Sequence, residues 1–123
     1  MINLSTFEDI FNKLIDLYQG KEVELISKQD NIIISNFTLT ISKITIKPLS
    51  KRQSKKWTRD GKKVGLIIIQ DKNTKTYFNI PFILGFNTMK ATFLKNGARI
   101  KSLKMEFLIK EVKKKSKNLR KAN

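Results

Sequence analysis

After Gly20, apolar side chains recur with a period of two, and this pattern limits the fold more than any other feature of the sequence. Residues 32–46 are rich in β-branched side chains that alternate with polar ones, which is typical of a half-buried strand. Residues 64–69 are almost continuously apolar and predict a central strand covered on both faces. Residues 76–82 predict a further strand, which Pro81 places at an edge of the sheet or near a strand end.

One helix is expected before these strands, over residues 5–19. Its apolar residues fall at helical spacing on one face, at Phe7, Ile10, Phe11, Leu14, Leu17 and Tyr18. Ser5 and Glu8 fit a capping box, in which each side chain satisfies an early helix N–H group. Gly20 is well placed to end the helix. The apolar face therefore predicts packing on a core.

The strand pattern also indicates bends and hairpins. The apolar parity slips near Ser35-Asn36 and near Ser42-Lys43, where a turn or bulge would restore the register. Asn96-Gly97 is the pair that a two-residue type I′ hairpin turn favours, and it would place Phe93 opposite Ile100. The last strand is then expected to run to about residue 111, with one apolar face made of Leu103, Met105, Phe107 and Ile109.

These elements predict an α+β fold that is mostly β. A single domain over residues 1–112 would pack its N-terminal helix on a curved antiparallel sheet or a small open barrel, OB-like or SH3-like, of five to seven strands. Residues 113–123 form a basic tail that we expect to be disordered when unbound. Seven phenylalanines are expected in the core, namely Phe7, Phe11, Phe37, Phe78, Phe82, Phe93 and Phe107.

Composition argues against an enzyme. The chain has no cysteine and no histidine, which excludes thiol chemistry and removes the commonest general base and metal ligand. The glycines are scattered singly, so no phosphate-binding loop is present. Glu111-Val112-Lys113 matches a short element of one nuclease class, but its acidic partner would have to be Asp71, and the tripeptide is expected by chance in a lysine-rich segment. We expect no cofactor and no metal.

Charge is distributed unevenly along the chain. The formal net charge is +16, yet residues 1–42 carry three lysines against six acidic residues. Residues 43–123 carry the remaining 23 basic residues against four acidic ones. An AT-rich genome would favour lysine everywhere, but it would not leave the first third acidic. The asymmetry favours a polyanionic partner over a merely solubilising surface, and both interpretations remain open.

Two segments concentrate the basic residues, a long connection at 48–63 and the end of the chain. Trp57 in the connection could stack on an unpaired base or fold back onto the core. Tyr77 points away from the apolar face of its strand and is a second stacking candidate. The remaining candidate nucleic-acid contacts are Lys47, Lys51, Arg52, Lys55, Lys56, Arg59, Lys62, Lys63, Arg99, Lys101, Lys113, Lys114, Lys115, Lys117, Arg120 and Lys121.

The function expected from these features is non-enzymatic binding of nucleic acid through the phosphate backbone. Lysine outnumbers arginine 22 to 4, which favours weak sequence specificity, and single-stranded DNA or RNA is preferred because no recognition-helix module is evident. A small phage or mobile-element protein that inhibits or adapts a host protein is the first alternative, and a structural virion or ribonucleoprotein component is the second. No apolar run approaches the roughly 18 residues of a membrane span, so we expect a cytoplasmic protein without a membrane partner.

Overall fold

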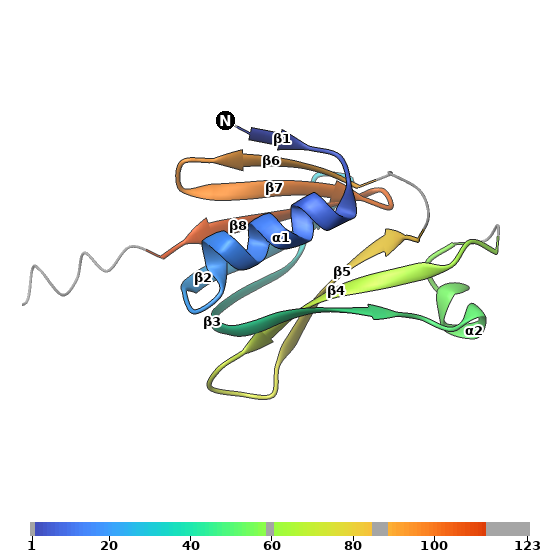
Figure 1. Cartoon of the computed structure of the whole chain (residues 1–123), viewed down its shortest axis with the longest axis horizontal. Coiled ribbons are helices and arrows are strands. Elements are labelled where there is room, and N and C mark those ends of the chain that lie inside the picture. Colours follow the sequence, from blue (N-terminus) through green and yellow to red (C-terminus); the bar gives the residue numbers. More distant parts are fainter. Residues whose placement is uncertain (1, 59–60, 85–88, 113–123) are drawn as a thin grey trace, which may run out of the picture.

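The computed structural model describes residues 2–58, 61–84 and 89–112. Its elements are β1 (Ile2–Leu4), α1 (Phe7–Tyr18), β2 (Glu22–Gln29), β3 (Ile32–Pro48), α2 (Lys51–Ser54), β4 (Val64–Asp71), β5 (Tyr77–Ile83), β6 (Lys90–Leu94), β7 (Gly97–Ser102) and β8 (Met105–Glu111). The described strands form one open antiparallel sheet in the order β1-β6-β7-β8-β2-β3-β4-β5 (Figure 1). The fold is mostly β, as predicted, and its sheet has more strands than the expected five to seven.

The long strand β3 joins two halves of this sheet. Residues 32–40 pair with β2, and residues 41–48 pair with β4. The register shifts once opposite Ser27 and Lys28, and once between Ile41 and Lys43. These irregularities lie close to the two places where the apolar parity slips, so the predicted bulges are confirmed. Figure 1 shows β1, β6, β7, β8 and β2 on one side and β4 and β5 on the other.

Helix α1 lies against the sheet and contacts β3 and β6 (Figure 1). Ile10, Leu14 and Tyr18 are buried in the main core. The ring of Phe7 stacks on Phe82 of β5, with 4.8 Å between the ring centroids. The helix therefore covers the inner face of the bent sheet, as the spacing of its apolar residues predicts.

The predicted helix ends are nearly right. The N-cap is Thr6 and not Ser5, because the Thr6 hydroxyl accepts a hydrogen bond from the Asp9 amide at 3.4 Å. Gly20 has a φ of +88°, the left-handed conformation expected of a residue that ends a helix. Neither helix in the described residues is long and apolar enough to cross a membrane.

The core is built from the expected apolar faces, with one exception among the phenylalanines. Phe78, Phe82, Phe93 and Phe107 are buried, and Phe7 and Phe11 pack against the cluster half-buried. Phe37, expected in the core, is 45% exposed and meets Phe78 edge-on, with 6.3 Å between the centroids. Phe37 lies in the part of β3 with which β4 does not pair, because that pairing begins only at residue 41.

Two hairpins in the last part of the chain differ from the prediction. Leu94 pairs with Gly97, so the turn is Lys95-Asn96 and Gly97 begins β7. Phe93 consequently lies opposite Ala98 and not Ile100. The prediction that Leu103 belongs to the last strand is also wrong, because the chain turns between Ser102 and Met105. A side chain on Gly97 would collide with the Ile109 carbonyl oxygen, so this glycine serves close strand packing.

The free edge of the sheet at β5 carries Pro81, as predicted. Pro81 lies opposite Leu66 of β4, and its carbonyl accepts a hydrogen bond from the Ser102 hydroxyl at 2.5 Å. This bond links the β5 edge to the end of β7 across the opening of the sheet. β4 is buried along most of its length, which confirms the strand covered on both faces that its apolar run predicts. It is not central, because it lies next to the edge strand β5.

Candidate nucleic-acid interface

The connection predicted at residues 48–63 is largely an ordered structure, which we call the α2 segment (residues 49–63, described except for 59–60). It begins where the Leu49 amide donates to the Val64 carbonyl at 2.8 Å. Ser50 caps α2 through a capping box with Gln53. The buried hydroxyl of Ser54 then accepts a hydrogen bond from the Val64 amide at 3.0 Å. Both ends of the helical turn are therefore attached to the start of β4.

A small apolar cluster lies under this segment. Leu49, Val64 and Leu66 are buried together, and Leu103 from the β7–β8 turn packs against them. The segment consequently rests on β4 and on the other half of the sheet at once. Thr58 donates to the Lys62 carbonyl at 3.1 Å, which closes the segment before β4.

The α2 segment presents a concentrated positive charge to solvent. Lys51, Arg52, Lys55 and Lys56 are exposed, and none of them forms an ion pair with a described residue. Residues 49–58 contain no acidic residue. Like charges held on one short helical turn repel one another, so the arrangement favours an anion beside it.

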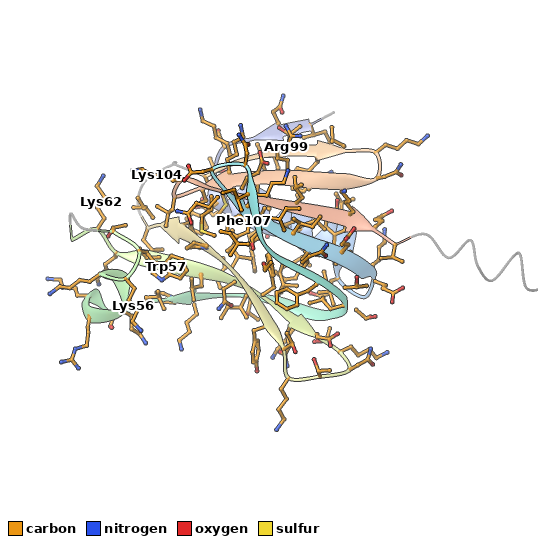
Figure 2. The ribbon with its side chains drawn as sticks, turned by 180° about the vertical axis from the view of Figure 1, so that it is seen from behind. Lys56, Trp57, Lys62, Arg99, Lys104 and Phe107 are labelled. Atoms are coloured by element: carbon orange, nitrogen blue, oxygen red, sulfur yellow. The ribbon has the colours of Figure 1, made fainter. Side chains whose placement is uncertain are left out.

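Trp57 lies on this segment, next to Lys56 and on the same end of the molecule as Lys62 (Figure 2). Its side chain is 39% exposed, so it is neither fully covered by the core nor fully presented to solvent. Its amide donates to the Ser54 carbonyl at 3.0 Å, which fixes the backbone at this position. A partly exposed indole on a fixed backbone can stack on a base with little loss of conformational entropy.

The other predicted contacts lie in different places. Lys47 is exposed on β3 opposite Leu66, close to the α2 segment, and Lys63 is exposed just before β4. Tyr77 is 54% exposed but pairs with Gln70 at the far end of β4, about 20 Å from Val64 along the strand. The structure therefore does not bring the two aromatic candidates together.

Arg99 and Lys101 project from the outer face of β7. The Arg99 Nε lies 3.6 Å from a carboxylate oxygen of Glu106, which partly neutralises it. The remaining predicted contacts lie outside the described residues, and these are Arg59, Lys113, Lys114, Lys115, Lys117, Arg120 and Lys121.

The carboxylates considered for catalysis have structural partners. Asp71 accepts hydrogen bonds from the Thr74 hydroxyl at 2.7 Å and from the Thr40 amide at 3.1 Å. These bonds, led by the Thr74 hydroxyl, lower the pKa of Asp71 from its ordinary value. Glu111 accepts from the Lys21 ammonium at 3.0 Å. Burial, and to a lesser degree the charge of Glu111, raise the pKa of Tyr18 to about 12. The described residues contain no group of three potential metal ligands from His, Cys, Asp and Glu.

Sequence reasoning missed three lysines that the fold brings close to Lys101. Lys28, Lys90 and Lys104 line the same surface hollow as Lys101, which has a volume of about 370 Å³. Lys104 lies only three residues after Lys101, but Lys28 and Lys90 stand apart from the dense basic segments, so a search for such segments does not detect these two. Only the strand register could have revealed them.

Comparison of the chain with protein-family models, with curated proteins and with solved structures gives no match.

Proposed function

We propose that this protein is a non-enzymatic, cytoplasmic nucleic-acid-binding protein that holds the phosphate backbone of single-stranded DNA or RNA with its α2 segment. The observation that carries the proposal is the exposed cationic turn of Lys51, Arg52, Lys55 and Lys56, which is anchored to β4 beside Trp57 and forms no ion pair with a described residue. Each cation that neutralises a phosphate releases a counterion, and the indole can add a stacking contact. The bend of β3, which folds one half of the sheet towards the other, supports an OB-like or SH3-like barrel as part of the same proposal.

The proposal is tested by fluorescence anisotropy with labelled single-stranded DNA, duplex DNA and RNA at several salt concentrations. Lys55→Gln combined with Lys56→Gln should lower the slope of log affinity against log salt by about 1.4, at about 0.7 per phosphate contact on a single strand. Lys72→Gln combined with Lys75→Gln removes the same charge at the exposed β4–β5 turn and is the matched control. Equal effects of the two pairs would show that net charge alone drives binding.

Trp57→Ala tests the stacking contact separately. It should cost about 1–3 kcal/mol of binding free energy on single strands and much less on duplex DNA. Trp57→Phe should retain most of the affinity, because a phenyl ring also stacks. If no nucleic acid binds more tightly than about 10⁻⁴ M near physiological salt, the proposal is wrong. The inhibitor or adaptor of a host protein and the structural virion or ribonucleoprotein component are then the functions to pursue.

A further inference from the structure

We propose that the hollow between the β2–β3 and β7–β8 turns is a phosphate-binding site, which we call the lysine hollow. Lys28, Lys90, Lys101 and Lys104 line it, together with the acidic side chains of Asp30 and Glu106. The lysines come from β2, from β6 and from the β7–β8 hairpin, which supplies both Lys101 and Lys104. Ammonium groups are strongly hydrated point charges with three donors each, and phosphate is an anion that they bind well.

The pairing register of four strands aligns three of these lysines across the sheet. Lys90 of β6 lies directly opposite Lys101 of β7, Lys101 lies opposite Glu106 of β8, and Glu106 lies opposite Lys28 of β2. Directly opposed residues of an antiparallel pair share one face of the sheet. Lys90, Lys101, Glu106 and Lys28 therefore form one row across the sheet, about 14 Å long at the usual strand spacing, and Lys104 lies in the β7–β8 turn that also lines the hollow.

The opposed lysines Lys90 and Lys101 work against folding. Like charges directly opposite each other in an antiparallel pair are destabilising. No described residue forms an ion pair with either of them. An anion bound between Lys90 and Lys101 would offset this repulsion. The opposed pair therefore favours an anion-binding site at this position.

The two acidic residues do not neutralise the hollow. Four lysines against Asp30 and Glu106 leave two uncompensated positive charges in the lining. Glu106 is also shared with Arg99, whose Nε is 3.6 Å from its carboxylate oxygen. The hollow therefore keeps a positive field that favours an anion with more than one charge.

The β7–β8 turn holds Lys104 in an unusual backbone conformation. Leu103 and Lys104 have φ values of +49° and +64°, a region that glycine and asparagine favour and leucine rarely occupies. Leu103 is held there by its packing against the apolar cluster under the α2 segment. The same packing places Lys104 on the side of the molecule that carries Trp57 and Lys62 (Figure 2).

The phosphate groups can come from two sources. One is the backbone of a nucleic acid that continues from the α2 segment across the β7–β8 turn, and this form rests on the proposed function. The other is a free polyphosphate or a nucleoside polyphosphate. Both present the same multiply charged phosphate chemistry to the four lysines.

The test uses the full chain and two probes, inorganic triphosphate and a labelled single-stranded oligonucleotide. The hollow variant combines Lys90→Gln with Lys101→Gln. The α2 variant combines Lys55→Gln with Lys56→Gln, and the charge control combines Lys72→Gln with Lys75→Gln. Triphosphate binding is followed by backbone amide chemical shifts in NMR spectra, and oligonucleotide binding by anisotropy. Thermal unfolding verifies that each variant is folded.

We expect triphosphate to shift the amides of residues 101–106, and the hollow variant to bind it about tenfold more weakly at physiological salt, while the control changes by less than twofold. An equal loss of oligonucleotide affinity in the hollow variant would identify nucleic acid as a source of the phosphate. Triphosphate binding without oligonucleotide binding would refute the proposed function and support a free polyphosphate. If the hollow variant matches the charge control with both probes, the lysine hollow is not a phosphate site, whatever the α2 variant shows.

Discussion

Ser54→Ala should loosen the α2 segment by removing one buried hydrogen bond. Ser54 is 2% exposed, and its hydroxyl accepts from the Val64 amide at 3.0 Å, at the first residue of β4. Alanine fits the same space but leaves the Val64 N–H buried without an acceptor. Such a group costs about 1–3 kcal/mol of the free energy of unfolding. With a slope of roughly 1–3 kcal/mol per molar urea, the unfolding midpoint should fall by about 1 M.

The matched control is Ser42→Ala. The Ser42 hydroxyl donates to the Gln70 carbonyl at 3.2 Å, but Ser42 is exposed, so water can replace it. Its loss should cost less than about 0.5 kcal/mol. Urea unfolding of both variants gives the comparison, and amide hydrogen exchange at Val64 should accelerate in Ser54→Ala alone. Equal midpoints for Ser54→Ala and wild type would refute the conclusion that this bond anchors the segment.

Three further outcomes are expected. Gly97→Ala should lower stability by about 1–3 kcal/mol in chemical unfolding, because its new methyl group meets the rigid Ile109 carbonyl, and a neutral effect would contradict that close approach. In a Tyr77→Phe variant, the ultraviolet absorbance of tyrosinate reports Tyr18 alone, and its titration should have a midpoint near pH 12. Because the folded pKa of Tyr18 exceeds the unfolded one, the free energy of unfolding should fall from about pH 10 upward. A titration midpoint at the ordinary tyrosine value would argue against burial of this hydroxyl. The pKa of Asp71 is lowered in the folded state, so its contribution to stability is present above its unfolded pKa near 3.9 and is lost as the pH falls through the lower folded value. Asp71→Asn should therefore reduce the loss of stability that the protein shows on acidification. An unchanged loss would show that other groups produce it.

Local features of the sequence predicted the elements that depend on near neighbours. Helix α1 follows from its apolar spacing and from Gly20, because both act within a few residues. The bulges in β3 follow from the slip in apolar parity, since each extra residue reverses the face of every side chain after it. The edge position of Pro81 follows from its missing N–H group.

Features that depend on distant contacts were misjudged. Asn96-Gly97 is a typical pair of hairpin turn residues, but the turn falls one residue earlier, at Lys95-Asn96. A glycine is needed at position 97 because the backbone of β8 leaves no room for a side chain there. The Leu103-Lys104 turn has no local signal, because packing of Leu103 on a distant cluster holds it. Phe37 alternates correctly with its neighbours, yet it is half-exposed in the part of β3 with which β4 does not pair.

For the candidate sites, the sequence by itself determined where charge is dense, and this was sufficient to find the α2 segment. Charge density along the chain is a local property, so Lys51 to Lys56 are visible without a fold. Only the tertiary structure decided that this connection is an anchored helical turn, because its anchor is the Val64 amide ten residues away from Ser54. Only the strand register brought Lys28 and Lys90 to the hollow that Lys101 and Lys104 also line, because register is set by pairing between strands.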